Sequence, residues 1–214
     1  MMLAFGLVSV LAGALLLPAV AQAQSVYGGA WVGGKAALNL TRVRGDLFID
    51  GDAVDFDTGS GFSIGGLAMF DAHPNVTIQV ELLYSVKNVD IGLDPDDDII
   101  ENEVGLDFFE IPLLAKLHGE RGRDATPFVL VGGTITLLTS AEQRITSGNF
   151  TLVEDIENEL DAIDIGLTFG GGVDLRQDWG LITIDARYTL ALGDLPEEGD
   201  VKLDTFAIGV GVVF

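Results

Sequence analysis

The sequence predicts an all-β fold, an eight-stranded antiparallel up-and-down barrel that spans a membrane, and three observations carry this prediction. Apolar and polar residues alternate in eight segments of the 214-residue chain. Long and short connections alternate between these segments. The chain is also both hydrophobic, at 48% hydrophobic residues, and strongly acidic, with a formal net charge of −22. An apolar wall with an acidic end would reconcile these two properties.

The composition excludes several other classes of protein. A mean hydropathy of +0.40 argues against global disorder, because disordered acidic chains have low hydrophobicity. With 11 Lys and Arg residues against 33 Asp and Glu residues, the chain is not expected to bind nucleic acid, which requires basic patches. The sequence contains no Cys, which excludes disulfides, thiolate nucleophiles, zinc sites with Cys ligands and a lipid anchor on an N-terminal Cys.

Residues 1–23 are predicted to be a secretory signal peptide. They contain no charged residue, and the apolar run Leu3–Leu17 precedes the small-residue pattern at Ala21 and Ala23. The run is shorter than the roughly 20 residues that a transmembrane helix requires. We therefore expect cleavage after Ala23 and export of residues 24–214 as one barrel domain. The alternative is an N-terminal anchor that is not cleaved.

The eight segments are predicted strands because their residues alternate between two faces. In the clearest case, Val76–Lys87, the face with Val76, Ile78 and Val80 is apolar and the opposite face is mostly polar. Twelve alternating residues exceed the five or six of a typical strand and suit a membrane-spanning strand of about 9–11 residues. The predicted strands are residues 28–41, 61–70, 76–87, 106–118, 126–139, 162–175, 181–192 and 202–214.

The segment 106–118 departs from regular alternation. Leu106 and Phe108 lie on one parity, whereas Phe109 and the apolar residues after it lie on the other. This change of phase predicts a β-bulge near residues 108–110. Pro112 also lacks a backbone N–H within this strand, which argues mildly against the register because a closed barrel has no edge strand.

The long connections hold most of the negative charge. The short connections are residues 71–75, 119–125 and 176–180, and the long ones are 42–60, 88–105, 140–161 and 193–201. The four long connections contain five, seven, six and four acidic residues, which is 22 of the 33 in the chain. Short periplasmic turns and long extracellular loops are typical of outer-membrane barrels. The sequence thus predicts an acidic extracellular end.

Several segments resemble a known family. The chain ends on Phe214 in phase with Phe206, and 109–116 (FEIPLLAK), 126–133 (TPFVLVGG) and 184–188 (IDARY) add local likeness. Together they resemble the outer-membrane β-barrel domain family that includes PorT-like proteins, similar in architecture to small OmpX/OmpA-type barrels. The resemblance implies location in the bacterial outer membrane, contact with its lipid and recognition of Phe214 by the barrel-assembly machinery. It implies no particular activity.

The residues indicate no catalytic site. The two histidines, His73 and His118, both fall at the short-turn end, where we expect ordinary surface histidines. Because both histidines fall at the opposite end, neither is available for a catalytic site at the outer rim. We therefore predict a protein that is not an enzyme and has no cofactor.

Charged residues on the lumen-facing parity are expected to form a packed plug. A barrel of eight strands is just wide enough to be filled by side chains, and unpaired charges there would be costly. Pairs of Glu110 with Lys116, or of Asp185 with Arg187, also fit a pore lining or a proton-handling site. The charged residues on this parity are Lys35, Glu81, Lys87, Glu110, Lys116, Asp164, Asp174, Asp185 and Arg187.

One acidic run is a candidate for divalent cations. Asp94, Asp96, Asp97 and Asp98 supply the carboxylate oxygens that Ca²⁺ and Mg²⁺ prefer. The run does not match the EF-hand pattern, because Ile99 and Gly105 occupy positions where Gly and Glu are required. A solvated loop is the preferred interpretation, with loose Ca²⁺ or Mg²⁺ association as the alternative.

The predicted function is a non-enzymatic structural or surface-interaction role in the outer membrane. Three alternatives stay open: a small porin-like conduit, an outer-membrane enzyme, and a soluble lipocalin-like binding barrel with its apolar face inside. The sequence names no ligand, partner or oligomeric state.

Overall fold

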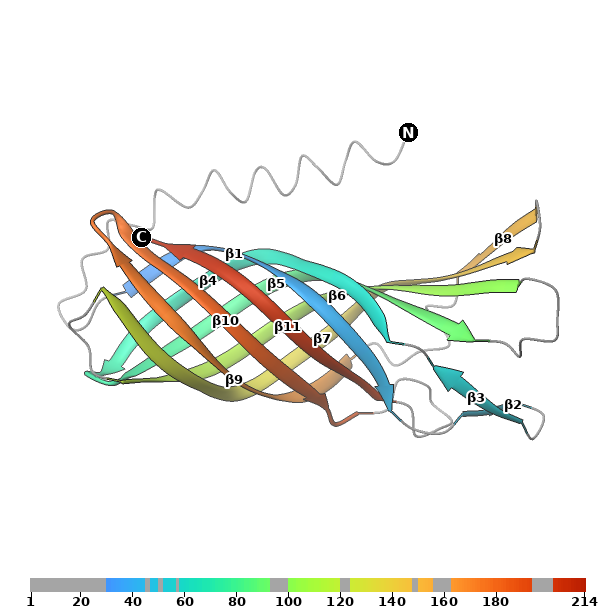
Figure 1. The fold of residues 1–214 in the computed structure, drawn as a ribbon, viewed down its shortest axis with the longest axis horizontal. Coiled ribbons are helices and arrows are strands. Elements are labelled where there is room, and N and C mark those ends of the chain that lie inside the picture. Colours follow the sequence, from blue (N-terminus) through green and yellow to red (C-terminus); the bar gives the residue numbers. More distant parts are fainter. Residues whose placement is uncertain are drawn as a thin grey trace.

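The computed structural model is a closed barrel of eight antiparallel strands (Figure 1). The structure describes residues 30–44, 47–49, 52–56, 58–92, 100–119, 124–147, 150–155, 163–193 and 202–214. Each strand of the wall pairs with the next one along the chain, and β1 pairs with β11 to close the ring. The wall consists of β1 (Ala30–Arg44), β4 (Gly59–His73), β5 (Val76–Gly92), β6 (Ile100–His118), β7 (Ala125–Ser147), β9 (Ile163–Gln177), β10 (Gly180–Ala191) and β11 (Lys202–Val213). The predicted fold and all eight predicted strands are confirmed.

Three further strands lie in connections that the sequence indicated only as loops. They are β2 (Leu47–Ile49), β3 (Asp52–Phe56) and β8 (Phe150–Asp155). β3 pairs with the end of β5, and β8 pairs with the end of β7. Figure 1 shows that these strands project beyond the barrel at the end opposite the C-terminus. The described parts of the first three long connections therefore extend the barrel sheet past its rim.

The two faces of the wall differ as alternation predicts. On β5 the side chains of Thr77, Gln79 and Glu81 are buried in the lumen, whereas Leu82, the residue after Glu81, is 56% exposed on the outside. Outward residues of other strands are equally apolar and exposed, such as Leu38 at 73%. A soluble barrel with an apolar interior is thus contradicted. Among the described residues no helix is long and apolar enough to cross a membrane.

A bulge is present close to the predicted position, near residues 108–110, but its extra residue lies on β7 and not on β6. The β6–β7 register shifts between Asp107 and Phe108, opposite Thr139 of β7. β6 itself stays in phase: Leu106 and Phe108 point inward and pack with Ala141 in a hydrophobic cluster. The apolar residues of β6 change parity because Leu106 and Phe108 are hydrophobic residues that face the lumen. Alternation alone does not distinguish this arrangement from a bulge.

Pro112 is accommodated within the closed wall. It pairs with Thr134 of β7, while pairing of β6 with β5 is interrupted between Leu113 and Glu110. The interruption fits a residue that has no N–H to donate. The barrel thus tolerates Pro112 as a local gap in one ladder.

Inward-facing glycines allow neighbouring strands to approach closely. A Cβ atom on Gly132 would lie 2.0 Å from the carbonyl oxygen of Leu113, and one on Gly65 would lie 2.0 Å from that of Leu82. The next residues in the chain, Gly133 and Gly66, would place a Cβ at ordinary contact distances of 3.7 and 3.8 Å. The concave face of this tightly curved sheet therefore requires Gly at these two positions.

Candidate functional site in the barrel lumen

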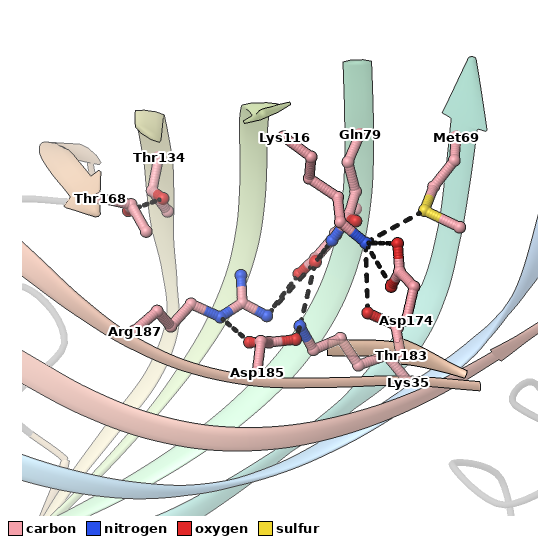
Figure 2. A network of polar contacts seen from close by, with 11 residues as sticks. Lys35, Met69, Gln79, Lys116, Thr134, Thr168, Asp174, Thr183, Asp185 and Arg187 are labelled. Atoms are coloured by element: carbon pink, nitrogen blue, oxygen red, sulfur yellow. Dashed lines mark hydrogen bonds and ion pairs between the residues drawn. The ribbon is translucent and has the colours of Figure 1, made fainter. Parts of the chain in front are cut away.

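A ring of four charged side chains occupies the middle of the lumen. Lys35 of β1 and Arg187 of β10 each contact both Glu81 of β5 and Asp185 of β10. Lys35 Nζ donates to Glu81 Oε1 at 3.2 Å and to Asp185 Oδ2, and Arg187 Nη2 donates to Glu81 Oε2 at 2.9 Å. The Arg187 Nε atom lies 3.2 Å from Asp185 Oδ1. Figure 2 shows the side chains of Lys35, Asp185 and Arg187 turned toward one another inside the barrel.

The central ring is buried and has further polar support. The four residues are at most 5% exposed. The Gln79 amide donates a hydrogen bond to Glu81 Oε1. Each cation therefore meets two carboxylates, and each carboxylate meets two cations, which compensates much of the free-energy cost of burying charge.

A second ion pair lies between the ring and the short-turn end. Lys116 Nζ donates to both carboxylate oxygens of Asp174, at 2.8 and 3.0 Å, and to Thr183 Oγ1 at 3.2 Å. The ammonium group also lies 3.9 Å from the ring centroid of Phe128, in a cation–π contact, and 3.7 Å from the sulfur of Met69. Lys116 is completely buried. Its four partners come from β4, β7, β9 and β10, so this one side chain links much of the wall.

A third ion pair joins Lys87 of β5 to Glu110 of β6, with Nζ and Oε1 2.6 Å apart. Lys87 Nζ also lies 5.1 Å from the ring centroid of Phe108. Both side chains are nearly buried, at 6% and 14% exposure. The three groups together contain four basic side chains (Lys35, Lys87, Lys116, Arg187) and four carboxylates (Glu81, Glu110, Asp174, Asp185).

The predicted lumen pairs are partly correct. Asp185 does contact Arg187, whereas Glu110 pairs with Lys87 and not with Lys116. Six residues separate Glu110 from Lys116 on one strand, which places their backbones about 20 Å apart and favours partners on other strands. Asp164 forms no part of the three groups: its Oδ1 accepts the N–H groups of Ile165 and Gly193, at 2.7 and 2.8 Å.

The space left in the lumen is small. Three cavities lined by lumen side chains measure about 50, 20 and 20 Å³. Pockets for small molecules typically measure about 300–1,000 Å³, whereas one water needs about 10–15 Å³. These cavities suit a few waters. The described part of the lumen is therefore a packed, charge-balanced plug.

The histidines lie at the short-turn end, as predicted. His73 is exposed, and its Nδ1 accepts the N–H of Asn75 at 3.4 Å. The prediction of a surface histidine is wrong for His118, whose side chain is only 6% exposed because its ring faces lumen partners: Nε2 lies 3.0 Å from Thr77 Oγ1 and Nδ1 lies 3.6 Å from Asp174 Oδ2.

The Thr77, His118 and Asp174 arrangement resembles a hydroxyl–imidazole–carboxylate triad, but its hydrogen bonds run the wrong way. The Thr77 hydroxyl has one proton and donates it to Asp71 Oδ1 at 2.7 Å. His118 Nε2 must then donate to Thr77 Oγ1, so it has no lone pair with which to accept the hydroxyl proton. This geometry does not activate Thr77 as a nucleophile.

One buried acidic residue at the loop end was not expected from the sequence. Asp204 shares the outward parity of Phe206, yet it is only 3% exposed. Its carboxylate accepts hydrogen bonds from Arg44 Nε at 3.1 Å, Tyr188 OH at 2.8 Å and the N–H of Ala191 at 3.1 Å. Alternation places Asp204 on the outside. It does not reveal the burial of this residue, because the three donors come from other strands and follow no local sequence pattern.

The candidate cation ligands Asp94, Asp96, Asp97 and Asp98 lie outside the described residues. Within the described ranges, no group of three or more His, Asp or Glu side chains is placed to hold a metal ion. The signal peptide prediction, at residues 1–23, also lies outside the described part of the chain. Both stay predictions.

Comparisons with known proteins agree with this architecture. A family model described as "Outer membrane protein beta-barrel domain" matches residues 21–197. A search of the curated proteins finds no match. The outer membrane protein OprG from Pseudomonas aeruginosa is similar in fold, with a TM-score of 0.54 and 13% identity over 87% of this chain and 96% of that chain.

Two other solved structures are similar at lower scores. Neisserial surface protein A has a TM-score of 0.48 and 15% identity, over 88% of this chain and 99% of that chain. Outer membrane protein W from E. coli also has a TM-score of 0.48 and 15% identity, over 87% of this chain and 97% of that chain. The family match concerns the barrel domain as a whole, so the resemblance to PorT-like members stays a prediction.

Proposed function

This chain belongs to the outer membrane protein beta-barrel domain family, and from that premise we propose that it is a non-enzymatic barrel with a sealed lumen. It lies in the bacterial outer membrane. The observation that carries the proposal is the lumen network, in which four cations and four carboxylates are paired around cavities of water size. A plug of this kind serves a structural or surface role better than transport.

The surface role rests on the loop end of the barrel. There β2, β3 and β8 extend the sheet beyond the rim, and the long connections contain 22 of the 33 acidic residues. In outer-membrane barrels the longer loops face the outside of the cell. We infer that this end presents an acidic surface to cationic partners, or to the divalent cations of the surrounding medium.

Planar-bilayer conductance tests the sealed lumen. The refolded wild-type barrel should insert without producing discrete conductance steps, because the paired side chains fill the lumen. The matched variant is Arg187→Ala, which removes the largest cation of the central ring and should introduce transient openings. Regular steps from the wild-type protein would favour a small conduit and contradict the sealed lumen.

Labelling of intact cells tests the surface role. A short epitope inserted among residues 93–99 should be reached by an antibody without permeabilising the cells. The same epitope inserted among residues 120–123, in one of the short connections, should be reached only after permeabilisation. The opposite pattern would reverse the orientation and remove the acidic end from the cell surface.

A further inference from the structure

The barrel sheet continues beyond its rim at the loop end, where β8 forms one of its edges (Figure 1). β5, β6 and β7 stay paired past the rim, and β8 pairs with β7 along its whole length, Phe150–Asp155. On the same side of β7, β9 extends no further toward the loop end than Leu137, and the next wall strand, β10, ends at Ala191. Among the described residues, no strand pairs with the side of β8 that faces away from β7.

An edge of this kind is a place where another chain can pair. The backbone N–H and C=O groups along an edge strand can take up an extended segment of a second chain. β8 offers six residues for such pairing, whereas β2, the edge on the opposite side of the sheet, has three. Very short edge strands are poor templates for pairing. A partner strand therefore fits β8 better than β2.

The inner face of this extension of the sheet is apolar. The inner face is the one that holds Val104, which is buried with Leu106 and Phe108 in the hydrophobic cluster at the loop end of the lumen. The register between strands and the alternation along each strand place six more apolar residues on this face. They are Val89, Ile91, Ile100, Ile145, Phe150 and Leu152. The extension therefore reverses the polarity of the wall, whose lumen face is mostly polar.

The outer face of the extension is acidic. It continues the face of Asp107 and includes Asp90, Glu101, Glu103, Glu142 and Asp155. Arg144 is the one basic residue at these register positions. Glu142 of β7 is paired with Asp155 of β8, so this acidic pair lies at the open edge. A strand added beside β8 thus borders an apolar face on one side of the sheet and an acidic face on the other.

We propose that the β8 edge binds an extended peptide in which apolar and basic residues alternate, an inference that rests on the proposed surface role of the loop end. Successive residues of a strand belong to opposite faces of its sheet. In a peptide paired with β8, one set of residues adjoins the positions of Phe150 and Leu152 on the inner face. The other set adjoins Asp155, with Glu142 one strand spacing of about 5 Å further away. Opposite charges on neighbouring strands stabilise a sheet, which favours Lys or Arg in this second set.

The charge of the chain favours an external partner over the chain itself. The connections 93–99 and 156–162, which adjoin the extension in sequence, contain seven acidic residues and no basic residue. Either of them beside β8 would bring like charge to the acidic face, and so would a second copy of a chain with net charge −22. A cationic peptide is instead attracted to this end, over about 8 Å at physiological ionic strength.

Binding of a synthetic peptide to the full barrel tests the proposal. The probe is a fluorescein-labelled peptide of about ten residues in which Lys and Val alternate, long enough to cover the six residues of β8. The barrel is held in nanodiscs of phosphatidylcholine, and empty nanodiscs give the background from partitioning into the membrane. We expect saturable binding, measured as a rise in fluorescence anisotropy, that weakens at high salt.

Two control peptides separate strand pairing from charge attraction. A peptide with the same Lys and Val residues arranged in two blocks cannot place them on opposite faces, and it should bind at least about tenfold more weakly. A peptide that alternates but has N-methylated amides cannot donate main-chain hydrogen bonds, and it should also bind at least about tenfold more weakly. Equal binding of either control peptide would overturn the proposal, because a paired strand requires both features.

Substitutions locate the site on the barrel. Glu142→Gln/Asp155→Asn removes the acidic pair at the open edge and should weaken binding about three- to tenfold. The matched control, Glu197→Gln/Glu198→Gln, removes two acidic residues from another long connection and should leave binding unchanged. Leu152→Thr retains strand propensity and should weaken binding through the inner face. A heat-dependent shift in gel mobility confirms that each variant is folded.

The outcomes distinguish this site from the surface role on which it rests. Equal losses in the two double variants would overturn the proposal, because they would show general attraction to the acidic end. Binding in nanodiscs does not depend on orientation in the cell. An accessible epitope at residues 93–99 without peptide binding would therefore overturn the β8 site and leave the surface role intact. Saturable binding with an inaccessible epitope would support the β8 site and remove the surface role.

Discussion

Removing the Glu81 carboxylate should destabilise the barrel more than most single substitutions. Glu81→Gln keeps the shape of the side chain but leaves Lys35 and Arg187 with Asp185 as their one shared carboxylate in the central ring. The ring then carries a net charge of +1 in a site where Glu81 is 1% exposed. Breaking a buried ion pair typically costs about 3–5 kcal/mol, because the remaining charge is uncompensated.

The assay is urea unfolding of the barrel in phospholipid vesicles, followed by fluorescence of Trp31 and Trp179. We expect Glu81→Gln to lower the free energy of unfolding by about 3–5 kcal/mol. Asp178→Asn, in an exposed turn, is the control and should change it by less than about 0.5 kcal/mol.

A double variant separates charge balance from lost contacts. Lys35→Met/Glu81→Gln removes one cation and one anion, and it leaves Arg187 paired with Asp185. The double variant should lose less stability than the sum of the losses measured for Lys35→Met alone and Glu81→Gln alone, by at least about 1 kcal/mol. A loss below about 1 kcal/mol for Glu81→Gln, or strict additivity in the double variant, would refute the view that paired charge stabilises this lumen.

Three substitutions and one deletion test the wall of the barrel and its loop end. Gly132→Ala should destabilise it by more than about 2 kcal/mol, or prevent refolding, because the added Cβ meets the backbone, whereas Gly133→Ala should cost less than about 1 kcal/mol in the same unfolding assay. Comparable losses at both positions would contradict the role assigned to inward glycines. Deleting Thr139 removes the extra residue of the bulge and leaves Leu138 and Ser140 consecutive, opposite Phe108 and Asp107, so the side chains of β7 keep their faces. The yield of heat-modifiable protein should therefore stay close to that of the wild type, and a steep fall would contradict this register. Asp204→Ala leaves the donors of Arg44, Tyr188 and Ala191 without their acceptor and should cost about 2–3 kcal/mol, and an unchanged unfolding midpoint would contradict a stabilising role of these hydrogen bonds.

The sequence predicted the wall of the barrel because a membrane strand imposes a strict physical rule. Outward residues such as Leu38 and Leu82 must be apolar to face lipid, so period-two alternation identifies strands and their faces directly. The same rule predicted that Lys35, Glu81 and Arg187 face the lumen. Alternation failed at Leu106 and Phe108, because apolar residues are permitted inside as well as outside.

Pairing within the lumen could not be predicted in the same way. Which cation meets which carboxylate depends on the register between strands far apart in sequence, as in the contact of Lys116 with Asp174. The pair Asp185 and Arg187 was an exception, since two residues on one face of one strand are necessarily close. Strands β2, β3 and β8 were missed because three, five and six residues are too few for alternation to be recognised, and β3 and β8 also contain acidic residues.

The most direct test of the central claim is the gel mobility of the detergent-extracted protein, unheated and boiled. The account places apolar residues on the outside and a paired polar network inside, so the protein should require detergent for extraction. Its unheated band should migrate as a folded species and shift on boiling, because closed membrane barrels resist SDS until they are heated. A protein that extracts in water and shows no shift would contradict the assignment of the two faces, and with it the sealed, charge-paired lumen.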